Sequence, residues 1–62
     1  MSCNVAVNFG ALVMPAGYKV IWCEGVEHYL AVHEASGWES DITWDRFQAR
    51  RWCIKRAEAD YA

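Results

Sequence analysis

Residues 18–33 predict a β-hairpin whose two faces are both apolar, and this feature restricts the fold more than any other. The segments 18–23 and 28–33 are rich in β-branched and aromatic residues and flank a Glu-Gly-Val-Glu turn at 24–27. Side chains alternate between the two faces of a strand. One face therefore holds Tyr18, Val20, Trp22, Tyr29, Ala31 and His33, and the other holds Ile21, Cys23, His28, Leu30 and Val32.

An antiparallel sheet with one face in water normally alternates apolar and polar side chains. This hairpin lacks that alternation, so each face needs a covering layer. The chain has 62 residues, which suffices for a single small domain with few other elements. It is 55% hydrophobic and 15% aromatic, which favours a folded chain over a disordered one. We therefore expect another protein or a second copy of the chain to cover one face.

The segment before the hairpin has a weaker strand signal. Residues 4–9 alternate between apolar and small or polar side chains, and Gly10 then interrupts the pattern. A Pro-Ala-Gly turn at 15–17 separates this segment from the hairpin of residues 18–34. We interpret residues 1–16 as a first strand or a flexible arm that covers one edge or one face of the hairpin.

Residues 41–60 predict a C-terminal helix. The stretch contains no Gly or Pro between 42 and 59 and is rich in strong helix formers. Ser40, Asp41 and Thr43 are suitable N-cap residues, and Asp45 suits the first turn. Helical periodicity predicts one core-facing arc and places Trp44 and Trp52 on the other side. The members of this arc are Phe47, Cys53, Ile54, Ala57 and Tyr61, of which Phe47, Ile54 and Ala57 are expected to contact the sheet.

The expected fold is therefore of the α+β class: a small antiparallel sheet of two or three strands followed by one C-terminal helix.

Charge is distributed unevenly along the chain. Residues 1–40 contain one lysine and four glutamates, whereas residues 41–62 contain five basic and four acidic residues. A typical nucleic-acid-binding domain is strongly basic overall, and this chain has a net charge of −2. A nucleic-acid surface on the helix remains an alternative, because aromatic residues are interleaved there with Arg46, Arg50, Arg51, Lys55 and Arg56.

No residue pattern predicts catalysis, a metal or another cofactor. The cysteines Cys3, Cys23 and Cys53 are odd in number and widely spaced, which favours reduced thiols in a cytoplasmic protein. Cys23 and His28 could approach each other across the turn, but a hairpin on one helix offers no pocket for a nucleophile. His28 and His33 point to opposite faces of a strand, which opposes joint binding of a metal.

The apolar stretch at residues 5–14 is too short to span a membrane. The glutamates at the hairpin tip, Glu24 and Glu27, fit a solvated loop better than an acid–base pair.

In size and in its lack of chemical motifs, the chain is similar to small accessory proteins of bacteriophages and mobile elements, which often cap a host protein. That similarity implies a non-enzymatic interaction module that occludes a host protein through its hairpin edge or its aromatic side chains. A homodimer is a further possibility, and a small DNA- or RNA-binding regulator is the alternative. The predicted partner-binding residues are Trp22, Tyr29, Trp38, Trp44, Trp52, Arg46 and Arg50.

Overall fold

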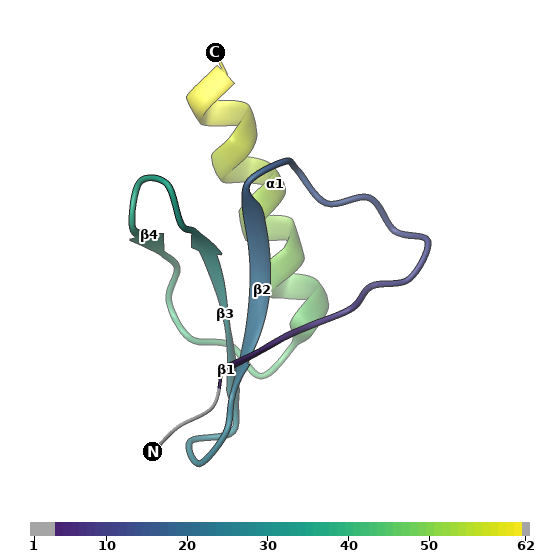
Figure 1. Ribbon diagram of the computed structural model, residues 1–62, viewed down its shortest axis with the longest axis vertical. Coiled ribbons are helices and arrows are strands. Elements are labelled where there is room, and N and C mark those ends of the chain that lie inside the picture. The colour runs from purple at the N-terminus through teal and green to yellow at the C-terminus, as the bar shows by residue number, and fades with distance from the viewer. Residues whose placement is uncertain (1–3, 62) are drawn as a thin grey trace.

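The computed structural model describes residues 4–61 and shows one antiparallel sheet with a helix packed on one face (Figure 1). The predicted α+β class is confirmed, and the sheet has four strands rather than two or three, in the order β1-β2-β3-β4. The elements are β1 (Asn4–Ala6), β2 (Tyr18–Cys23), β3 (His28–His33), β4 (Trp38–Glu39) and α1 (Arg46–Tyr61).

The central hairpin forms as the sequence predicts. Its register pairs Tyr18 with His33 and Cys23 with His28, so the predicted sharing of faces is confirmed. The Glu27 amide donates a hydrogen bond to the Cys23 carbonyl (2.9 Å) and closes the four-residue turn. Gly25 has a φ of 92° in this turn, a conformation that glycine adopts without steric cost.

The helix begins at Arg46, whereas the sequence predicts a start at residue 41. The residues in between extend along β3 instead. The Ser40 amide donates to the Ala31 carbonyl (2.9 Å), and Thr43 and Tyr29 exchange two backbone hydrogen bonds of 2.7 and 3.1 Å. These long-range hydrogen bonds keep residues 40–43 extended, and this Ser-Asp-Ile-Thr stretch contains none of the strongest helix formers.

Asp45 is the N-cap of the helix. Its carboxylate accepts a hydrogen bond from the Phe47 amide (2.9 Å), and its carbonyl accepts from the Gln48 and Ala49 amides. The predicted caps Ser40, Asp41 and Thr43 precede the helix by several residues. Ser40 instead uses its hydroxyl to accept a hydrogen bond from the Ala31 amide (2.9 Å).

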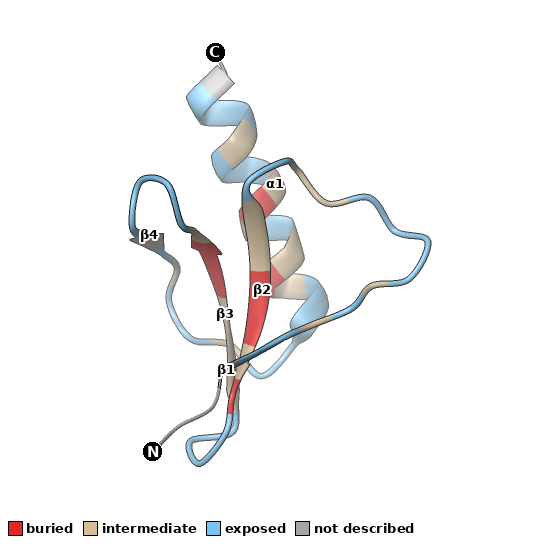
Figure 2. Ribbon diagram, viewed as in Figure 1, coloured by how far each residue is buried: buried red, intermediate tan, exposed pale blue. Residues whose placement is uncertain are grey.

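The main core lies between the sheet and the helix (Figure 2). Val20 and Ala31 from the sheet meet Ala49 and Cys53 from α1, and all four are at most 1% exposed. Trp52 packs against this cluster from the side.

The predicted sheet-facing stripe of α1 is only partly right, because Cys53 is buried at the sheet as expected, but Trp52, expected on the other side, also packs against the core. Phe47 is 43% exposed, and Ile54 and Ala57 are only half-buried. Two small side chains, Ala49 and Cys53, face the sheet instead and allow a close approach of the helix.

The long connection between β1 and β2 packs on the same side as the helix. Val7, Phe9 and Met14 contact the main core, and the Phe9 ring lies 5.8 Å from the Phe47 ring. The Arg50 guanidinium donates two hydrogen bonds, of 2.7 and 3.2 Å, to the Val13 carbonyl. The leading segment is thus a short edge strand followed by a loop that extends the helix-side core.

Candidate interaction surfaces

Among residues 4–61, the helix and the loop between β1 and β2 pack on the first face of the sheet, and three apolar residues of the second face are also less than 10% exposed. Ile21, Cys23 and Val32 form an apolar cluster with Leu30, and every member of this cluster comes from β2 or β3. We call this side of the sheet the open face, and it presents Ala6, Lys19, Ile21, Cys23, His28, Leu30, Val32 and Glu39.

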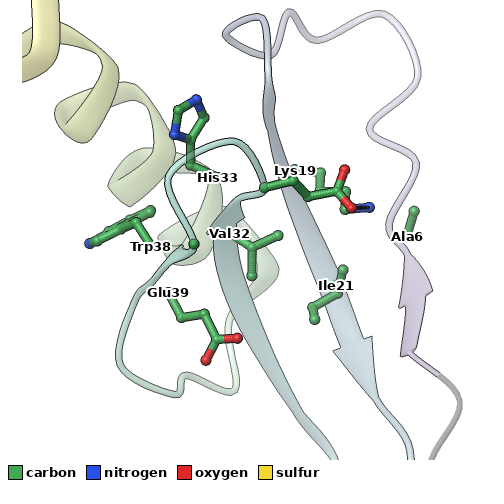
Figure 3. Close-up of a pocket in the computed structure, with 9 residues that line it drawn as sticks. Ala6, Lys19, Ile21, Val32, His33, Trp38 and Glu39 are labelled. Atoms are coloured by element: carbon green, nitrogen blue, oxygen red, sulfur yellow. Dashed lines mark ion pairs between the residues drawn. The ribbon is translucent and has the colours of Figure 1, made fainter.

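A shallow hollow of about 320 Å³ lies on the open face (Figure 3). Ile21 and Val32 line it together with Lys19 and Glu39, whose charged groups stand on opposite sides of Val32. The Lys19 ammonium group lies 3.2 Å from the carboxylate of Glu34. The hollow therefore combines an apolar floor with a charged rim, on which Lys19 pairs with Glu34 on one side of Val32 and Glu39 lies on the other.

Three of the predicted binding residues lie near the hairpin turn, and two of them, Trp22 and Tyr29, are register partners on the helix side of the sheet. The Trp22 and Tyr29 rings pack with their centroids 4.7 Å apart. The backbone of Thr43 pairs with that of Tyr29. Trp44 is the next residue in the chain, and its side chain is 71% exposed. Val5 is the register partner of Trp22 and is half-exposed. We call these four residues, Val5, Trp22, Tyr29 and Trp44, the aromatic end.

The other two predicted tryptophans lie elsewhere in the fold. Trp38 and Trp52 are half-buried and pack against the helix-side core. The Arg56 guanidinium lies 5.4 Å from the centre of the Trp38 ring, a cation–π contact. Both tryptophans therefore contribute to the packing of the helix-side core. Their contact with a partner protein stays a prediction.

The basic residues of α1 do not form one continuous surface. Arg50 is bound to the Val13 carbonyl, and Arg56 pairs with Asp60 at 3.4 Å. Arg46 stacks on Phe47, with its guanidinium 5.0 Å from the ring centre. Arg51 hydrogen-bonds to the Gln48 side chain (2.9 Å), so four of the five residues proposed for nucleic-acid contact already have an intramolecular partner.

A second hollow, of about 520 Å³, lies where the last turns of α1 meet the ends of β2 and β3. The Tyr18 hydroxyl donates a hydrogen bond to Asp60 (2.6 Å), and the Tyr18 ring stacks on His33 at 4.3 Å. This hydrogen bond raises the pKa of Tyr18 and lowers the pKa of Asp60. No sequence pattern indicates this contact, because its two partners are 42 residues apart. The residues that line the hollow are Pro15, Ala16, Tyr18, His33, Ile54, Ala57, Glu58 and Asp60.

The two described cysteines are buried, free thiols. Cys53 lies on α1 in the helix-side core, Cys23 lies in the cluster of the open face, and Cys3 lies outside the described residues. Burial raises the pKa of Cys53 to about 11, so its thiol is neutral at physiological pH and is a poor nucleophile. Cys23 and His28 are register partners, and His33 faces the helix side. Within residues 4–61, no three His, Cys, Asp or Glu side chains gather closely enough to hold a metal ion.

The described part of the chain also contains no helix with the length and apolar character needed to cross a membrane. Comparison with protein-family models, with curated proteins and with solved structures gives no match for this chain. Its function must therefore be inferred from its own residues.

Proposed function

We propose that this protein is a small interaction module without enzymatic activity that binds another protein through the aromatic end. The observation that supports this proposal is Trp44, which is 71% exposed and directly follows Thr43, the backbone partner of Tyr29. Tryptophan and tyrosine are the residues most often found at the energetic centre of protein interfaces. Exposing them in water costs free energy that a partner surface would recover.

The expected partner has an apolar recess with basic residues near its rim. The exposed hairpin tip beside the aromatic end contains Glu24 and Glu27, and no basic residue lies between them. Opposite charges at the rim of an interface accelerate association and orient the two proteins. In this role the module would occlude part of the surface of a host protein, as the small accessory proteins of phages and mobile elements do.

Addition of a partner strand to the central hairpin is disfavoured by the structure. β1 and the Val7 amide already occupy the outer edge of β2 along residues 20–23. β4, Ser40 and Thr43 occupy the outer edge of β3. The remaining free edges belong to strands of three and two residues, which are too short for a strong strand-addition site.

The test begins with identification of a partner by affinity capture and mass spectrometry, followed by calorimetry on the two purified proteins. Trp44→Ala should weaken binding by at least 5-fold, which corresponds to about 1 kcal/mol. Trp44→Phe should retain most of the affinity. Leu12→Ala is a matched control, because Leu12 is also a large exposed apolar residue but lies in the loop before β2. Equal affinities of wild type and Trp44→Ala would contradict the proposal.

A parallel titration with labelled DNA and RNA tests the alternative function. Phosphate contacts lose affinity steeply as salt is added. Salt-sensitive binding that is abolished by the double change Arg51→Glu and Lys55→Glu would replace the proposed function with nucleic-acid recognition. Absence of such binding is the expected result, given the intramolecular partners of the other basic residues.

A further inference from the structure

We infer that the open face is a self-association surface, on which a second copy of this chain packs face to face with Lys19 of each copy opposite Glu39 of the other. This inference goes beyond the proposed function, because it concerns the side of the sheet that faces away from the helix. It is a statement about the oligomeric state and the residues that determine it.

The strand register provides the first step. Lys19 is the direct partner of Val32 across β2 and β3, and Val32 is the direct partner of Glu39 across β3 and β4. Directly paired residues in neighbouring strands place their side chains on the same face. A positive and a negative side chain therefore flank Val32 at nearly equal distances, about 4.8 Å of strand spacing on either side.

Two-fold symmetry makes this row complementary to itself. Most homodimers have one two-fold axis, and the same patch of both copies forms the interface. An axis that runs along β3 at Val32, midway between two facing sheets, places Val32 over its own copy. It also places Lys19 over Glu39 of the second copy, and Glu39 over Lys19. The two charge pairs then enclose the apolar contact.

Both charged side chains are available for such pairing. Among residues 4–61, Glu39 has no salt-bridge partner. Lys19 pairs with Glu34, but the two side chains are 43% and 74% exposed. An ion pair in that setting contributes little free energy, so Lys19 can reorient towards a second carboxylate at small cost.

The rest of the open face fits a sheet-on-sheet contact. The next row consists of Ala6, Ile21 and Leu30, which are all apolar. Packed sheets lie about 10 Å apart and fill the space between them with interdigitated side chains. The hollow of about 320 Å³ above Ile21 and Val32 gives room for side chains of the second copy.

The size of this face predicts a weak dimer. Ile21 and Val32 are already less than 10% exposed, so much of the area that a second copy would bury belongs to Leu30 and the charged rim. A stable interface usually buries about 800 Å² on each partner, and weak or transient contacts bury less. We expect association in the range of roughly 10–500 μM, where binding free energies are about −7 to −4.5 kcal/mol.

The experiment is sedimentation equilibrium of the full chain over a concentration range that extends to about 1 mM, at low and at high salt. Lys19→Glu and Glu39→Lys should each weaken self-association by at least 3-fold, because each creates two like-charge contacts. The double variant exchanges the two charges and should return the affinity to within about 2-fold of wild type. Glu34→Gln is the matched control, since it removes the pairing within one copy and leaves the contact between copies.

Circular dichroism and urea unfolding establish whether each variant is folded. If a charge reversal prevents folding, the neutral variant at the same position, Lys19→Gln or Glu39→Gln, replaces it. A wild-type chain that remains monomeric at about 1 mM would overturn the inference. Self-association that is insensitive to both single reversals, or a double variant as weak as the singles, would also overturn it. Trp44→Ala should leave self-association unchanged, so failure of this inference and failure of the proposed function are distinguishable.

Discussion

At the scale of single residues, three small side chains set the distance between the helix and the sheet. Ala31, Ala49 and Cys53 are completely buried at the contact, and the largest fully buried side chains there are Val20 and Cys53. The sequence predicted which hairpin residues share a face, because alternation is strict in a strand. It did not predict the buried stripe of the helix, because several rotations of α1 present apolar side chains and only tertiary packing selects among them.

A larger side chain at Ala49 should therefore be destabilising. Ala49→Leu places extra volume into a contact without free space, and overpacking of this kind typically costs about 1–3 kcal/mol. Ala59→Leu is the matched control, because Ala59 lies exposed on the same helix. Urea denaturation gives both free energies of unfolding. A cost for Ala49→Leu no larger than that of Ala59→Leu would show that α1 is not packed closely on the sheet.

The Cys53 thiol should make stability fall at high pH. Burial raises the pKa of this thiol from 9.0 to about 11 in the folded state. The neutral thiol is therefore favoured by folding, and this contribution is complete below pH 9 and is lost as pH rises towards 11. Between these values the free energy of unfolding should decrease by on the order of 1 kcal/mol more in wild type than in Cys53→Ala. Urea denaturation at several pH values measures both slopes, and equal slopes would contradict the burial of the thiol.

At the scale of elements, the predicted hairpin is confirmed and the predicted start of the helix is wrong. The turn and the register of the hairpin are local properties, so the sequence is sufficient to predict them. The start of α1 depends on Thr43, which pairs with Tyr29, and on Asp45, which caps the first turn. β4 likewise depends on pairing with the end of β3 after the turn at Gly37, which has a φ of 77°. These are contacts between distant residues that composition alone does not show.

The loop between β1 and β2 is attached to the helix mainly through Arg50, the only described side chain that hydrogen-bonds to a carbonyl of this loop. Arg50→Ala should release the loop, so amide hydrogen exchange in residues 9–14 should accelerate by about 5–10-fold. The loss of global stability should be about 0.5–1 kcal/mol, the usual net value of such hydrogen bonds. Arg51→Ala removes only a contact within the helix and is the control. Unchanged exchange in Arg50→Ala would mean that the apolar contacts of Phe9 and Met14 hold the loop by themselves.

At the scale of the whole molecule, the helix and the leading loop both pack on one side of the sheet. Within residues 4–61, the apolar cluster of the open face draws only on β2 and β3, and its residues Ile21, Cys23 and Val32 are less than 10% exposed. The expectation that a partner covers this face therefore stays a prediction. The sequence could predict that both faces of the hairpin are apolar, because side chains alternate strictly along each strand. It could not predict the row formed by Lys19, Val32 and Glu39, because that row requires β4.

Contacts between copies can be observed directly at this scale. In an equimolar mixture of carbon-13-labelled and unlabelled protein at about 1 mM, isotope-filtered nuclear Overhauser spectra report only protons that are close in different molecules. Pairing through the open face predicts cross-peaks between the methyl groups of Val32 and Leu30 and the same residues of a second copy. A mixture that shows none of these cross-peaks at this concentration would contradict the assignment of the open face as an interface.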